Sequence, residues 1–172
     1  MSIIAKYKFN STLYADLIPE FNSEFTDYTV TDDTTTETDS DGNVIITRTI
    51  ESDTLPTLMR FGNTVSNGTG DYAKQSSLLE ILELNTSSVT DMSLMFYPCR
   101  QLITICNFDT SKVTSAYAMF SGCESLTTLD VSNFDTSNVT DMQYTQSTHI
   151  YSLVVLWNMH RCLKQCSSAH SF

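Results

Sequence analysis

The sequence has little positive charge and no long apolar run. Nine Lys and Arg stand against twenty Asp and Glu in 172 residues, a formal net charge of −11. Because binding to a phosphate backbone requires a basic surface, we expect no nucleic-acid partner and no adsorption to an anionic membrane. No segment approaches the roughly 18 apolar residues of a membrane-spanning helix, so we also expect no insertion into a bilayer.

Signals for export and for catalysis are also missing. The start, MSIIAKYKFN, lacks the apolar run that a secretory signal contains, so the sequence predicts no signal peptide. It has neither a Gly-rich phosphate loop nor a Ser, His and Asp in a triad-like context. We therefore expect a protein that is not an enzyme, with no catalytic residue and no cofactor.

The first part of the chain reads as a β-rich N-terminal module, residues 1–62. The stretch IIAKYKF alternates like a strand, and Asp41-Gly42 between two Thr-rich arms predicts a hairpin, because Gly tolerates the positive φ of a tight turn. Residues 14–25 are expected to form a short helix interrupted by Pro19. A predicted linker of Gly, Asn and Thr follows at residues 63–71.

Residues 72–142 repeat with a spacing of 24 to 26. Equivalent apolar positions are Tyr72, Phe96 and Phe120, then Leu78, Leu102 and Leu126, then Ile81, Ile105 and Leu129. A period of this length predicts a leucine-rich solenoid, in which units stack because one unit cannot bury its own apolar face. Met92, Met95 and Phe96 lie at i, i+3 and i+4 and predict a short helix. Cys99 and Cys123 share one repeat position, which suggests small buried residues.

The predicted fold class is therefore α+β: a short leucine-rich-repeat solenoid, with a strand plus a short helix in each 24–26 residue repeat, preceded by the β-rich N-terminal module. The five cysteines are too few and too unevenly placed for a disulfide scaffold.

The amino-acid sequence of the repeats also resembles that of a known family. LTTLDVSNFDTSNVTDM, preceded by MFSGCESL and one copy earlier by MFYPCRQL, resembles the BspA-like leucine-rich repeats of bacterial surface proteins, which also occur in gut phage proteins. The resemblance covers residues 72–142 and implies no catalytic residues. It implies a cell-surface, extracellular or virion location and binding to host proteins, matrix or other bacteria. Members usually carry an export signal and many repeats, in contrast to this sequence.

Residues 143–172 depart from the pattern. They contain no acidic residue but all three histidines and the only Trp. We interpret them as a truncated or frameshifted repeat, with an atypical terminal cap as the alternative. His160, Cys162, Cys166 and His170 have zinc-ligand chemistry, but their spacing matches no common finger, so we predict no metal site there. Likewise, residues 36–43 resemble a calcium loop but have Arg48 where that loop needs Glu, so we predict a solvated turn.

The strand face of the repeats is the predicted binding surface. Positions beside the inward Leu residues point to solvent in such solenoids, and here they are Glu80, Leu82, Thr104, Cys106, Thr128 and Asp130. The function predicted is a non-enzymatic interaction or adhesion module that binds a protein or cell-surface ligand. Two alternatives stay open: a truncated structural remnant without binding activity, and a zinc-binding protein that uses the C-terminal His/Cys tail.

Overall fold

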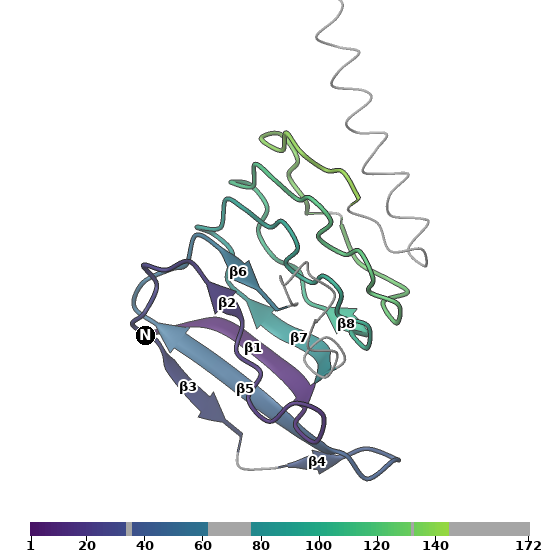
Figure 1. The fold of residues 1–172 in the computed structure, drawn as a ribbon. Helices are drawn as coiled ribbons and strands as arrows, with labels where there is room; N and C mark the ends of the chain where they lie inside the picture. Colours follow the sequence, from purple (N-terminus) through teal and green to yellow (C-terminus); the bar gives the residue numbers. More distant parts are fainter. Residues whose placement is uncertain (34–35, 62–76, 132, 145–172) are drawn as a thin grey trace, which may run out of the picture.

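The computed structural model describes residues 1–33, 36–61, 77–131 and 133–144 (Figure 1). Eight strands and no helical element lie within these ranges. The strands are β1 (Ser2–Asn10), β2 (Glu20–Phe21), β3 (Thr29–Asp32), β4 (Glu37–Thr38), β5 (Val44–Ser52), β6 (Met59–Arg60), β7 (Leu78–Leu84) and β8 (Thr104–Ile105).

One sheet connects the N-terminal part of the chain to the repeats. Its order is β3-β5-β1-β7-β8, and β4 also pairs with β5. β1 is antiparallel to both β5 and β7, whereas β7 and β8 are parallel. Residues 5–9 of β1 alternate as the sequence predicts: Ala5, Tyr7 and Phe9 are buried, and Lys6 and Lys8 are half-buried. The first strand of the repeats is therefore covered along one edge by β1.

The predicted hairpin is confirmed. β4 pairs with the start of β5, Glu37 opposite Ile45 and Thr38 opposite Val44. Gly42 in the connecting turn has φ +83°, the left-handed conformation that Gly adopts without steric cost. The Asp39 carboxylate accepts hydrogen bonds from the backbone N–H groups of Asp41 and Asn43, both at 2.9 Å, so it closes the turn.

The helix predicted at residues 14–25 is wrong. The described chain contains instead the two-residue strand β2, which pairs with β6. Pro19 has no N–H to donate and opposes a helix at this point. The segment packs as a loop over the sheet: Leu17 is fully buried, and its C=O accepts a hydrogen bond from the Tyr7 hydroxyl.

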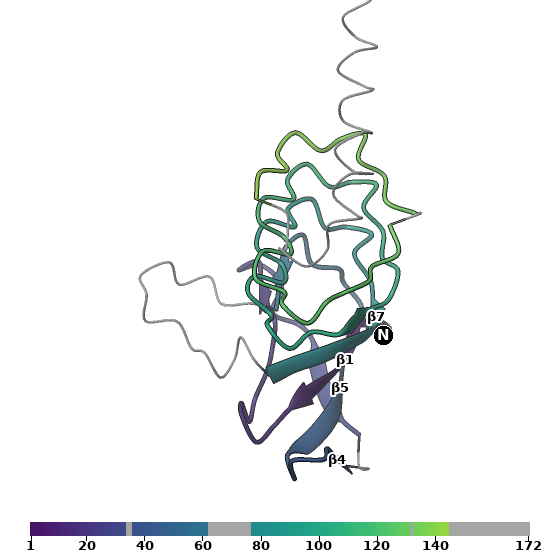
Figure 2. The same cartoon turned by 90° about the vertical axis from the view of Figure 1, so that its right-hand side faces the viewer.

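The repeats form stacked coils, which Figure 2 shows one behind another. The β7–β8 pairing joins the first two coils on one side. A second column joins them on another side through parallel bridges from Leu58 to Asp91, from Asp91 to Ser115 and from Ser115 to Asp141. Leu58 precedes the predicted repeats, so the column begins in the N-terminal module.

The predicted fold class is wrong in its helical part: the described structure is nearly all β, and the coils contain no strand-plus-helix units. The reason lies in the backbone hydrogen bonds. The N–H groups of Met92, Leu94 and Phe96 donate to carbonyls of the next coil at 2.8–3.0 Å, so they are withdrawn from an α-helix. Met95 N–H bonds back to Met92 C=O, three residues earlier. In these coils the i, i+3 spacing of apolar residues corresponds to tight turns and not to a helix.

The inward positions of the repeats form one continuous core with the N-terminal sheet. Leu78, Leu102 and Leu126 are fully buried. Cys99 and Cys123 are also fully buried, as the sequence suggests for a shared small position. Burial raises the pKa of the Cys123 thiol to about 12, so this thiol stays protonated at neutral pH. Tyr72 lies outside the described residues.

Candidate functional site

The predicted binding face begins on β7 and β8. Glu80 and Thr104 are direct partners in the parallel pairing of these strands. Thr104 is exposed and Glu80 is half-buried. On the other side of β7, Lys8 of β1 is the partner of Glu80. The face that the sequence assigns to the repeats therefore continues onto the N-terminal module.

Lys8 introduces positive charge into this face. Its ammonium group lies 2.9 Å from a carboxylate oxygen of Glu37 on β4. The hydrogen bond to Glu37, with a smaller contribution from the nearby Glu80 charge, raises the pKa of Lys8. The face thus combines a lysine with carboxylates and threonine hydroxyls, a pattern suited to polar contacts.

Thr128 and Asp130 belong to the next coil, and both are exposed. A backbone hydrogen bond from Ser125 N–H to Arg100 C=O at 3.1 Å ties the start of this coil segment to the preceding coil. In the 24-residue register, Thr128 corresponds to Thr104 and Asp130 to Cys106. Thr128 and Asp130 do not line the hollow described next.

Leu82 and Cys106 lie at a groove of about 350 Å³ at one end of the sheet. Its lining consists of Ile3, Leu82, Glu83, Leu84, Asn85, Thr86, Cys106, Asn107 and Asp109. The predicted site residues therefore fall into two groups. Glu80, Thr104, Thr128 and Asp130 lie on the open face, and Leu82 and Cys106 lie in the groove.

Two carboxyl groups and a thiol set the chemistry of the groove. Hydrogen bonds from the backbone and side chain of Ser111 lower the pKa of Asp109. The backbone nitrogen of Ser111 lies 2.8 Å from Oδ1 of Asp109. Burial raises the pKa of Cys106, and the Glu83 charge adds to this shift. At neutral pH the groove thus carries negative charge on Asp109 and a neutral thiol on Cys106.

Sequence reasoning missed most of the groove. Asn85, Asp109 and Asp135 occupy one repeat position, and each side-chain Oδ1 accepts a hydrogen bond from the N–H two residues later. This Asn/Asp periodicity is a signal that could have found two of the lining residues. The sequence gives no such signal for Ile3, because β1 reaches this end of the coils only through tertiary contacts, among them the hydrogen bond from Asn85 N–H to Ile4 C=O at 2.9 Å.

Residues that could hold a metal do not gather in the described parts of the chain, where no three His, Cys, Asp or Glu side chains form a ligand set. His160, Cys162, Cys166 and His170 lie outside the described residues. The described residues also include no helix long and apolar enough to cross a bilayer.

These features define a repeat protein of stacked coils, joined to an N-terminal β-sheet module. Residues 68–169 match the family described as "Mycoplasma protein of unknown function, DUF285", and the chain belongs to this family. The match begins before β7 and continues beyond the last described coil. No curated protein and no solved structure matches the chain significantly.

Proposed function

We propose that the chain is a non-enzymatic interaction or adhesion module of a bacterial surface protein or a phage structural protein. It binds a protein or a cell-surface ligand through the outward face of the sheet and coils. Two observations support this proposal: the resemblance of residues 72–142 to BspA-like surface repeats, and membership of a family that matches across the coils.

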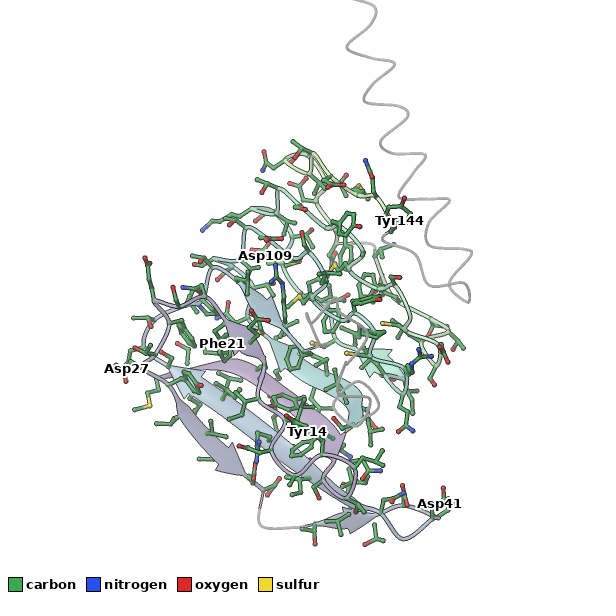
Figure 3. The ribbon with its side chains drawn as sticks, in the orientation of Figure 1. Tyr14, Phe21, Asp27, Asp41, Asp109 and Tyr144 are labelled. Atoms are coloured by element: carbon green, nitrogen blue, oxygen red, sulfur yellow. The ribbon has the colours of Figure 1, made fainter. Side chains whose placement is uncertain are left out.

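One structural observation carries the argument. Parallel pairing places Glu80 beside Thr104, and antiparallel pairing places Lys8 on the other side of Glu80. Polar side chains from β1, β7 and β8 thus lie beside one another on the sheet. Figure 3 shows the side chains of the sheet and the coils, with Asp109 labelled on the coils. A surface of this kind offers many weak polar contacts, which suits recognition of an extended partner.

The test is binding of the purified full chain to immobilised extracellular-matrix proteins and to whole bacterial cells, with a Thr104→Lys variant on the proposed face. A bulky cation at an exposed face position should weaken binding at least about tenfold, which corresponds to about 1.4 kcal/mol. Thr90→Lys is the matched control, because Thr90 is also exposed but lies beside the other column of bridges.

The outcome separates the function from its alternative. Binding that Thr104→Lys weakens and Thr90→Lys leaves unchanged supports the face. Binding that both variants leave unchanged contradicts it. No binding to any surface on the panel contradicts the adhesion function and favours a structural remnant.

A further inference from the structure

The groove lies where two neighbouring coils separate between two hydrogen bonds. The N–H of Cys106 donates to the C=O of Ile81 at 3.0 Å, where the β7–β8 pairing ends. Farther along, the Thr86 hydroxyl donates to the C=O of Asp109 at 2.6 Å. The chain segments between these two bonds line the groove, and Thr86 is almost fully buried. The ends of the opening are therefore fixed by the fold.

The walls of the groove combine aliphatic and acidic side chains. Ile3 and Leu82 are half-buried and supply apolar surface, whereas Leu84 packs against the core. Glu83 and Asp109 are exposed and supply carboxyl groups. No Lys, Arg or His belongs to the lining. The arrangement offers an apolar wall to the stem of a ligand and negative charge to its head.

The nearest cations leave these carboxyl groups available. Lys6 is the β1 partner of Glu83, and the charge of Lys112 acts on Asp109. Within the described part of the chain, no salt bridge joins either lysine to either carboxylate. A ligand cation could therefore approach Glu83, and the lone pairs of Asp109 that Ser111 does not occupy, without first breaking an ion pair.

We propose that this groove binds one basic side chain, arginine or lysine, of a partner polypeptide. The aliphatic stem lies along Ile3 and Leu82, and the cationic head lies at Glu83 and Asp109. Long basic side chains place their methylene groups on apolar surface while the charge stays near water, which matches this lining. The volume of about 350 Å³ is at the small end of ligand pockets, as a single side chain requires. The inference rests on the proposed function and names the chemistry of the partner.

Other ligand classes fit less well. An anion would meet two carboxyl groups and no lining cation. A divalent metal would need a closer set of ligands, and the described residues contain no cluster of three candidate ligands. A purely apolar ligand would leave the carboxyl groups desolvated without a partner, which is costly.

The experiment is an NMR titration of the ¹⁵N-labelled full chain with N-acetyl-arginine amide, compared with N-acetyl-citrulline amide, its neutral analogue of similar shape. We expect saturable shifts in the amide signals of residues 82–85 and 106–109 with the arginine probe, and none with citrulline. Glu83→Gln and Asp109→Asn should each weaken the arginine probe about two- to fivefold, the contribution of an exposed ion pair. Asparagine keeps an Oδ1 acceptor for Ser111 N–H, so the turn is preserved.

Glu24→Gln is the matched control, since it removes the same charge at an exposed residue outside the groove lining. The proposal is overturned if citrulline produces the same shifts, if the shifts spread over the acidic surface, or if Glu24→Gln weakens the probe as much as Glu83→Gln does. The two proposals fail separately. If Thr104→Lys weakens partner binding and Glu83→Gln does not, only the groove proposal is overturned. If the arginine probe binds specifically but the chain binds no surface on the panel, only the adhesion function is overturned.

Discussion

The ring of Phe61 lies nearly parallel to the ring of Phe96, with 5.8 Å between centroids and 10° between planes. Phe96 stacks in the same way on Phe120, at 5.5 Å and 7°. The N–H of Phe61 also donates to the C=O of Met95 at 2.7 Å. Residues 57–61 therefore occupy the place of a coil before the first repeat, and they join the core of the coils to the core of the N-terminal sheet.

We predict that Phe61→Ala lowers the free energy of unfolding by about 3–5 kcal/mol, because it removes a fully buried ring from the end of the stack. Phe134→Ala should cost less, since Phe134 is only half-buried. Urea denaturation followed by circular dichroism measures both values. Equal losses for the two variants would contradict the idea that Phe61 joins the two parts of the core.

The sequence could predict the inward positions of the coils but not their local conformation. The spacing of Leu78, Leu102 and Leu126 requires only that equivalent residues face one core, and any stacked coil satisfies this. The helix prediction failed because the i, i+3 pattern fits an α-helix and a series of tight turns equally well. Which of the two forms depends on hydrogen bonds to the neighbouring coil, a tertiary effect that local sequence does not encode.

Phe61 and the groove illustrate a second limit. Residues 62–76 separate Phe61 from β7. A search for repeats at a fixed period therefore does not find the place of Phe61 in the stack. The candidate face was predictable in part, because Glu80 and Thr104 follow from the repeat register. The groove depends on Ile3 of β1, and only the tertiary packing of β1 beside β7 brings that residue to the coils.

Each coil places a non-glycine residue in the left-handed conformation at one position. Leu94, Ala118 and Tyr144 have φ of 60°, 51° and 55°. This conformation costs an L-residue about 1–2 kcal/mol. Ala118 and Leu94 are both held by N–H bonds of 2.8 Å to the next coil, which fix the backbone there.

We predict that Ala118→Gly is less destabilising than Ala116→Gly by about 1–2 kcal/mol in the free energy of unfolding. Both residues are buried alanines, so the lost methyl group and the added freedom of the unfolded chain are similar. Only position 118 gains relief of backbone strain. Urea melts of the two variants under identical conditions give the difference, and equal destabilisation would show that the strain at Ala118 is absent.

Gly122 provides a second test of coil packing. Its φ is +78°, and a Cβ at this position would lie 2.6 Å from Cβ of Pro98 in the preceding coil. Gly42 has a similar φ of +83°, but a Cβ there would meet nothing within 4 Å. We predict that Gly42→Ala costs about 1 kcal/mol of strain alone, and that Gly122→Ala costs at least about 1 kcal/mol more because the coils must separate. Thermal or urea unfolding measures both, and equal costs would contradict close contact at Pro98.

The last prediction concerns acid stability and the buried Arg48. Its guanidinium donates two hydrogen bonds to the Asp32 carboxylate, at 2.6 and 2.8 Å, and one to Asp16 at 2.6 Å. The hydrogen bond to Arg48 lowers the pKa of Asp32 below its ordinary value of 3.8. A carboxyl group with a lowered pKa stabilises the folded state at pH values above its unfolded pKa, and this contribution disappears as the pH falls through the folded pKa.

We therefore expect the wild type to be more stable than Asp32→Asn at pH 7, with the gap closing as the pH falls below about 4. Urea titrations at pH 7, 5, 3 and 2 measure the free energy of unfolding for both proteins. Asp33→Asn is the matched control, because it removes the same charge from the exposed neighbouring residue. A gap between wild type and Asp32→Asn that stays constant down to pH 2 would show that the pairing with Arg48 contributes nothing through ionisation of Asp32.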